Sequence, residues 1–195
     1  MTERTVSPSQ EGDLLGRDLP DGLLAVRAAE GDEDSFAILV RRHGSSLLRL
    51  ARCMLGSPQD AEEAVQDAFV SAWRRLPEYR HSAEFRTWMY RITVNRCLTM
   101  RRRRPPPLSL DVVEPAAGDA WSQPARSAEQ DAATAALSRA LAELDVGQRI
   151  CWILREVEGL PYKEIAHVTR TSEPTVRGRL FRARRSLQEA MGPWR

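Results

Sequence analysis

The amino-acid sequence predicts an all-α protein of two small helical domains joined by a flexible, proline-rich linker, with a helix-turn-helix in the second domain. Apolar residues recur at helical spacing, and no stretch of useful length alternates as a strand would. Three prolines at 105–107 open an extended, acidic segment in the middle of the chain. With 195 residues, 42% of them apolar, the chain is long enough for one ordinary domain or two small ones.

The chain is expected to divide into four segments. Residues 1–20 are expected to be a flexible tail and residues 105–128 the linker. The helical domains are expected to span residues 21–104 and 129–195.

The first domain is expected to contain several short helices. A helical pattern starts at Asp21, and Asp34 is expected to cap a second helix that runs through Val40. A further helix is expected over Leu47–Leu55, where Gly-Ser-Pro ends it. The next helix has Asp60 at its start and continues to Pro77.

The charges are segregated, although the formal net charge is only +2. The stretch from Ser57 to Val70 carries four acids and no base, whereas Phe85 to Arg104 carries seven arginines and no acid. A second group of arginines lies near the C-terminus. Two separate cationic surfaces indicate a polyanionic partner that is contacted at two places.

Several classes of protein are disfavoured by composition. No apolar run reaches the roughly 18 to 20 residues that span a bilayer, and the first twenty residues lack a signal-peptide core, so the expected location is the cytoplasm. Cys53, Cys97 and Cys151 are far apart and have no metal-ligand spacing, so we expect packing thiols and no metal or cofactor.

The basic segment from Phe85 to Arg104 is predicted to be a helix with two different sides. At 100° per residue, four polar or aromatic side chains share an arc of about 80°. They are Trp88, Arg91, Asn95 and Thr99. An aromatic ring, an amide and arginines together suit an unstacked base and its phosphates, although a tryptophan at helical spacing also suits a core.

The C-terminal segment is predicted to form a helix-turn-helix. Pro161 suits the first turn of one helix, Arg170 and Thr171 form the turn, and Ser172 caps the second helix. The second helix is rich in arginine, which can bond guanine edges or clamp phosphates, and its start would meet the major groove. The alternative is an α-hairpin with a solvated basic face.

The order of motifs resembles a family. The stretches DEDSFAILVRRH, DAEEAVQDAFVSAWRRL, FRTWMYRITVNRCLTMRRRR and LPYKEIAHVTRTSEPTVRGRLFRARRSL, with a proline-rich linker before the last, are similar to group IV (extracytoplasmic-function, ECF) sigma factors of bacterial RNA polymerase. The resemblance covers about residues 23–191. It implies a first domain that binds core polymerase and the −10 promoter element and a second that binds the −35 element.

The resemblance also implies roles for individual residues. Those expected to contact the −10 element are Trp88, Arg91, Asn95, Thr99, Arg101 and Arg102. Those expected at the −35 element are Ser172, Thr175, Arg177, Gly178, Phe181 and Arg182. Those expected to bind core polymerase are Glu63, Gln66 and Asp67.

Two positions depart from familiar patterns. Housekeeping sigma factors have an aromatic pair where this chain has Arg91 and Ile92, which suggests weaker melting and stricter promoter choice. A small hydroxyl residue is common in the family where Gly178 stands.

The resemblance implies protein partners as well. They are the β′ clamp helices and the β flap of core RNA polymerase. Because members of this family are usually held inactive by an anti-sigma factor, such a partner is also expected, and it could hold the protein at the membrane. The protein is otherwise expected to be a nucleoid-associated monomer with promoter DNA as its target, no small-molecule substrate and no catalysis of its own.

Two other classes of function are weighed against this one. A helix-turn-helix repressor or activator would account for residues 129–191 but not for the acidic stretch or the first basic helix. A DNA recombinase would need a catalytic constellation, but His43, His81 and His167 are isolated in the sequence.

Overall fold

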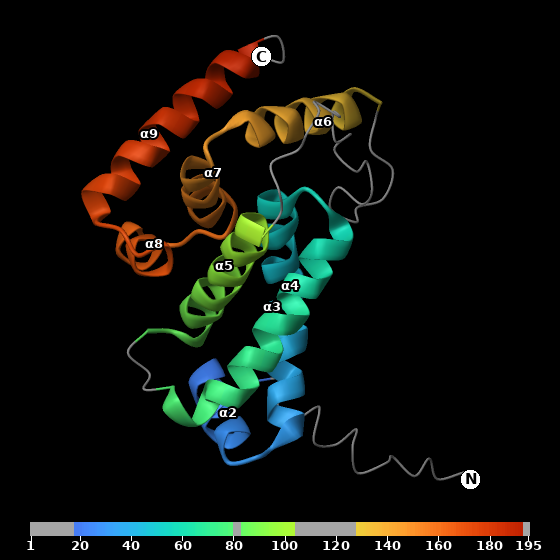
Figure 1. Cartoon of the computed structure of the whole chain (residues 1–195), viewed down its shortest axis with the longest axis vertical. Coiled ribbons are helices and arrows are strands. Elements are labelled where there is room, and N and C mark those ends of the chain that lie inside the picture. Colours follow the sequence, from blue (N-terminus) through green and yellow to red (C-terminus); the bar gives the residue numbers. More distant parts are fainter. Residues whose placement is uncertain (1–17, 80–82, 104–127, 193–195) are drawn as a thin grey trace.

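The structure, a computed structural model, describes residues 18–79, 83–103 and 128–192 (Figure 1). Within these ranges the chain is all-α and contains no strand, which confirms the predicted fold class. The expected N-terminal tail up to residue 17 and most of the expected linker lie outside the described residues.

The first half of the chain forms one helical bundle. Helix α2 packs on α3, and α3, α4 and α5 pack on one another. The elements are α2 (Asp21–Ala29), α3 (Glu33–Leu55), α4 (Pro58–Arg75), the 3₁₀ turn η1 (Leu76–Glu78) and α5 (Phe85–Arg103).

Helix α3 corrects the prediction of two separate helices in this part of the chain. It runs unbroken from Glu33 to Leu55 through the sequence His-Gly-Ser-Ser, whose helix propensity is poor. Tertiary packing outweighs propensity here, because Leu39, Leu47 and Leu50 are all fully buried on the two sides of this segment. The helix ends as predicted at Gly56, whose φ of 72° is left-handed.

The caps of α3 and α4 lie close to the predicted positions. Asp32, and not Asp34, caps α3: its carboxylate accepts a hydrogen bond from the Ser35 amide at 3.1 Å. Ser57 caps α4 in the same way through the Asp60 amide at 3.3 Å, so Asp60 is a first-turn acid that favours the helix dipole.

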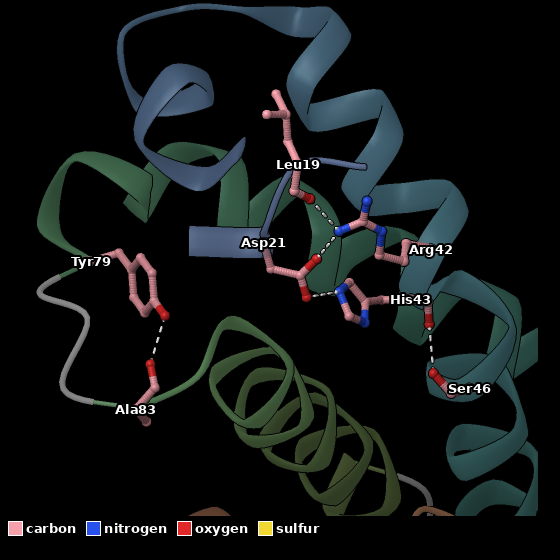
Figure 2. A network of polar contacts seen from close by, with 7 residues as sticks. All are labelled: Leu19, Asp21, Arg42, His43, Ser46, Tyr79 and Ala83. Atoms are coloured by element: carbon pink, nitrogen blue, oxygen red, sulfur yellow. Dashed lines mark hydrogen bonds and ion pairs between the residues drawn. The ribbon is translucent and has the colours of Figure 1, made fainter. Parts of the chain in front are cut away.

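A polar network fastens the start of α2 to α3 (Figure 2). The Asp21 carboxylate faces both Arg42 and His43, with His43 Nε2 at 2.7 Å, and Arg42 also donates to the Leu19 carbonyl at 3.0 Å. Partial burial would raise the pKa of Asp21, but the hydrogen bonds from His43 and Arg42 hold that pKa below its ordinary value.

The second half of the chain holds the helix-turn-helix. Ser172 caps α9 as predicted, through the Thr175 amide at 3.4 Å, and Pro161 is the N-cap of α8. The elements are α6 (Ala128–Glu143), α7 (Val146–Trp152), the π-helical turn η2 (Ile153–Val157), α8 (Tyr162–Thr169) and α9 (Glu173–Ala190).

The two halves pack against each other. Helix α8 lies on α5 and α7 lies on α3, and most buried apolar residues of the two halves form one continuous cluster, while a smaller cluster lies between α6 and α9. Glu158 is central to the interface: its side chain is 6% exposed and accepts hydrogen bonds from Arg49 of α3, at 2.7 and 3.0 Å, and from the Tyr90 hydroxyl of α5. Arg149 adds a bond to the Cys53 carbonyl at 3.1 Å.

The three cysteines are free and lie in or beside this core. Cys97 and Cys151 are buried and Cys53 is half-buried. Burial raises the pKa of all three thiols, that of Cys97 to about 12, so each is held as a neutral packing group.

Candidate nucleic-acid and protein interfaces

The polar side of α5 forms the wall of a concavity of about 340 Å³ between α4 and α5. The four residues predicted to share one arc all line it, so the structure brings them together. The concavity is lined by Asp67, Ala68, Ser71, Arg75, Glu78, Trp88, Arg91, Ile92, Asn95, Arg96, Thr99 and Arg170. On the opposite side of α5, Tyr90, Val94 and Cys97 are buried.

Trp88 belongs to both the core and the concavity. Its ring packs against Tyr79, with 4.9 Å between ring centroids, and against Phe85 at 5.8 Å. These neighbours fix the indole from one side, while the side chain remains half-buried at the concavity. A role in the core and a role in binding a base are therefore compatible for Trp88, because one part of its ring is packed and another part is accessible.

The arginines at the end of α5 have local partners. Arg101 donates to the Met54 carbonyl at 3.3 Å and so satisfies the C-terminal end of α3. Arg102 donates to the Leu98 carbonyl at 3.3 Å. Both side chains are exposed and retain further donors for a phosphate.

Helix α9 presents a mixed surface to solvent. Val176, Leu180, Ala183 and Leu187 face the core. Phe181 is 69% exposed, the largest value among the exposed large apolar side chains of the described residues. Thr175, Arg177 and Arg182 are exposed as well, so the sequence-predicted −35 residues of α9 are accessible.

Other arginines of α9 are committed to intramolecular contacts. Arg184 pairs with Glu156 at 2.6 Å and Arg185 with Glu189 at 3.0 Å. Arg179 lies against α7, where a Cβ on Gly147 would come within 2.9 Å of its guanidinium carbon. Arg177 and Arg182 make no ion pair with the described part of the chain, which marks them as the cations available to a partner.

The acids predicted to bind polymerase lie on one exposed side of α4. Glu63 and Gln66 are exposed and Asp67 is half-buried. Both carboxylates are paired with Arg96 of α5: its Nη2 contacts Asp67 Oδ2 and lies 3.5 Å from Glu63 Oε1. Glu62 pairs instead with Arg52 of α3 at 3.7 Å.

An apolar groove of about 640 Å³ lies beside these acids, between α3 and α4. The groove was not predicted from the sequence, because helical spacing shows which apolar residues share a face of a helix but not whether another element covers that face. The available signal was that Phe69 and Val70 are adjacent. Adjacent residues point 100° apart on a helix, so both cannot point to the centre of the same buried face, and one of them was a candidate for an exposed apolar surface. The groove is lined by Glu33, Phe36, Val40, Gly44, Leu48, Glu62, Val65, Gln66, Phe69, Val70 and Trp73.

Helix α8 covers part of the polar side of α5. Thr87 donates to Glu164 of α8, and Arg91 lies 3.2 Å from His167 Nε2. Arg170, in left-handed backbone with φ 52°, ends α8 and lines the concavity. The candidate −10 surface is thus bordered by the helix-turn-helix.

The arrangement at Asp21 and His43 is not that of a catalytic triad. Asp21 and His43 form a carboxylate–imidazole pair, but the nearby Ser46 hydroxyl donates to the His43 carbonyl oxygen at 3.0 Å and not to the ring. No group of His, Cys, Asp and Glu within the described ranges could hold a metal ion. None of the helices there is long and apolar enough to span a membrane.

Comparison with known families defines the class of protein. The family models described as "Sigma-70 region 2" and "Sigma-70, region 4" match residues 39–105 and 134–187, together more than half of the chain. The first match contains α4, α5 and most of α3, and the second contains the helix-turn-helix.

Similar proteins narrow this class. The RNA polymerase sigma-H factor of Pseudomonas aeruginosa is 34% identical over 89% of this chain and 94% of its own length. The ECF RNA polymerase sigma-E factor of Escherichia coli K12 is 32% identical over 92% of this chain and 98% of its own. The chain belongs to the ECF sigma factors of the sigma-70 family.

A solved structure agrees. CnrH, determined in complex with the cytosolic domain of CnrY, is 31% identical and superposes with a TM-score of 0.68 over 89% of this chain and 97% of its own. The sigma factor RpoE of Bartonella quintana, solved with the anti-sigma factor NepR, has the same fold at a TM-score of 0.61 and 22% identity.

Proposed function

We propose that this sigma factor reads the −10 element with α5 and the −35 element with α9, while α4 binds core RNA polymerase. The observation that carries the proposal is the meeting of Trp88, Arg91 and Asn95 in one concavity of α5. A stacking surface, a guanidinium and an amide are what capture of an unstacked base requires.

Promoter opening follows from this capture. A base taken out of the duplex stacks on the accessible part of Trp88, and the Asn95 amide bonds its edge. Arg101 and Arg102, at the end of α5, hold the phosphates of the same strand. The contacts of Trp88 and Asn95 form only with an unpaired base, so their binding energy favours the open duplex.

The −35 element is read by the exposed surface of α9. Arg177 and Arg182 are the arginines available for guanine edges or phosphates, and Phe181 offers an apolar surface for a thymine methyl group. Ser172 and Thr175 lie at the N-terminus of the helix, where backbone amides favour a phosphate. Gly178 has no side chain, so DNA can approach the helix backbone closely at this position.

Polymerase binds on α4. Glu63, Gln66 and Asp67 supply acid and amide groups for a basic partner, and the neighbouring apolar groove with Phe69 and Val70 supplies buried area. The resemblance makes the β′ clamp helices the partner of this surface and the β flap a partner of the second domain.

Regulation by an anti-sigma factor is part of the proposal. It is supported by the likeness to CnrH, which was solved with the cytosolic domain of CnrY. The protein acts in the cytoplasm, where polymerase and promoter DNA are, and has no catalytic activity of its own. The domain limits of 21–104 and 129–195 remain those suggested by the sequence.

Reconstitution tests the assignment of α4. The double variant Glu63→Arg/Gln66→Ala should lose core polymerase binding while its melting temperature stays near that of the wild type, because both side chains are exposed. A matched control is Glu189→Arg, at an exposed acid of α9. Unchanged affinity of the double variant for core polymerase would reject the assignment.

A further inference from the structure

Arg96 connects the two surfaces assigned to different partners. It lies on α5 next to Asn95 and lines the same concavity, yet its Nη2 is paired with Asp67 and Glu63 on the acidic side of α4. One guanidinium therefore neutralises the acids assigned to polymerase and borders the site assigned to DNA.

Its hydrogen bonding is incomplete. Both carboxylates are served by Nη2 alone, and Nε is buried with no hydrogen-bond partner within the described residues. A guanidinium offers five donors and suits the bidentate geometry of a phosphate. Arg96 can thus hold more acceptor oxygen than the two acids supply to it.

We propose that Arg96 is a positioning residue that couples polymerase binding to capture of the −10 strand. In the free protein Arg96 is held by Glu63 and Asp67. When a basic surface of polymerase takes these carboxylates, the guanidinium turns to a phosphate of the strand in the concavity. This inference rests on the proposed function, since it assigns polymerase to α4 and DNA to α5.

The exchange is physically accessible. The side chains of Glu63 and Asp67 are 61% and 43% exposed, and ion pairs between exposed groups contribute little to stability. Arg96 itself is 28% exposed, so its outer atoms reach solvent without unfolding of α5. Replacement of one anion by another requires only a change of side-chain rotamer.

The proposed coupling between polymerase binding and DNA binding can be measured through thermodynamic linkage. If polymerase releases Arg96 for DNA, then DNA must raise the affinity for polymerase by the same factor. The coupling factor is the ratio of two dissociation constants for core polymerase, measured without and with a saturating single-stranded oligonucleotide that carries the non-template −10 sequence. If the ion pairs of Arg96 only stabilise the packing of α4 on α5, substitution of Arg96 would leave the coupling factor unchanged.

The test compares the full-length wild type with Arg96→Met, which keeps the apolar stem and removes the charge. We expect the coupling factor to fall several-fold, while polymerase affinity without oligonucleotide is kept or rises because the acids are no longer neutralised. The salt dependence of oligonucleotide binding to the holoenzyme should weaken by a slope of about 0.7, the value for one phosphate contact on a single strand.

Two further variants keep the test decisive. Arg96→Lys retains the charge without the fork and should give an intermediate factor, which also serves if Arg96→Met does not fold. Glu189→Gln, at an acid of α9 that is paired with Arg185 and lies outside both surfaces, should keep the wild-type factor. An unchanged factor in both Arg96 variants overturns the inference, whereas a wild type that binds neither polymerase nor oligonucleotide overturns the proposed function.

Discussion

Side chains on the polar side of α5 differ in the intramolecular hydrogen bonds that they make. The Thr99 hydroxyl donates to the Asn95 carbonyl at 2.9 Å, and Arg91 lies against His167 of α8. The side-chain amide of Asn95 has no hydrogen bond within the described residues, so it needs no prior partner to be displaced. Asn95 is therefore the residue at which the −10 assignment can be tested most cleanly.

We predict that Asn95→Ala impairs promoter opening selectively. One good base contact is worth about 1 to 3 kcal/mol, so open-complex formation at a cognate promoter should fall by about tenfold or more. Affinity for a duplex carrying only the −35 element should stay unchanged, because the proposed −35 contacts lie on α9. Permanganate footprinting and fluorescence anisotropy measure the two quantities; equal losses in both would contradict the role given to Asn95.

Asp21 gives a prediction for pH. Its pKa is lowered in the folded chain, so its carboxylate stabilises the fold fully above the unfolded value of 3.8, and this contribution is lost as pH falls through the folded pKa. Because the side chain is 26% exposed, Asp21→Asn should lower the free energy of unfolding at pH 7 by only about 1 to 2 kcal/mol.

Urea titrations at several pH values check this expectation. The difference between wild type and Asp21→Asn should be present above about pH 5 and shrink as pH falls below about 4. Glu30→Gln, at an exposed carboxylate just after α2, is the control and should be nearly silent. A difference that does not shrink below about pH 4 would contradict the network in Figure 2.

Among the helices, two glycines on facing elements differ in what surrounds them. A Cβ on Gly178 of α9 would meet only the guanidinium of Arg182, with Nη1 at 3.5 Å and Nη2 at 3.9 Å, which is ordinary contact. A Cβ on Gly147 of α7 would lie 2.9 Å from Arg179 Cζ and 3.1 Å from the Asp145 carboxylate that caps the helix.

We predict opposite effects of alanine at these two positions. Gly178→Ala should stabilise the chain by up to about 1 kcal/mol through helix propensity. Gly147→Ala should destabilise it by about the worth of a displaced cap, roughly 1 kcal/mol. Thermal unfolding measures both. If Gly178→Ala also weakens −35 binding, the glycine serves close approach to DNA; stabilisation without any loss of binding assigns it no such role.

Helix type and most helix ends were predictable from the sequence, because caps, prolines and apolar spacing act locally. Gly56, which ends α3, and Ser172, which caps α9, illustrate this. The continuity of α3 was not predictable, because Gly44 and its neighbours are helical only through packing with other helices. The shared arc of Trp88, Arg91, Asn95 and Thr99 follows from helix geometry alone, but their joint placement with Ser71 and Arg170 depends on tertiary structure.

On the scale of the whole molecule, the two halves are held closed by buried polar contacts that no local pattern indicates. Glu158 follows the π-helical turn η2, and its carboxylate enters the interface between α3 and α5. Burial, together with the hydrogen bond to Glu158, raises the pKa of Tyr90, so the tyrosine stays a neutral donor. Removal of Glu158 would leave Arg49 and Tyr90 without this acceptor.

We predict that Glu158→Ala loosens the two halves. The loss of a largely buried pair should cost about 2 to 4 kcal/mol, less than for a fully buried pair because Arg49 is 29% exposed. Small-angle scattering should show a larger radius of gyration at unchanged helical content. Glu156→Ala, which breaks an exposed pair within the second half, should cost under about 1 kcal/mol and leave the radius unchanged.

Opening of this interface would also uncover α5, since α8 borders the candidate −10 surface through His167 and Arg170. A sigma factor that reads two promoter elements must use both halves at once. In the proposed function, three surfaces therefore act together when a promoter is recognised: the acids of α4, the concavity of α5 and the exposed surface of α9.

The most direct test of that claim is to map transcript starts made by core polymerase with this protein on a randomised promoter library. The account predicts starts that share two constrained sequence blocks at a fixed separation. The downstream block should relax with Asn95→Ala and the upstream block with Arg177→Ala. A single constrained block, as a helix-turn-helix regulator would give, or no start dependent on the protein would contradict it.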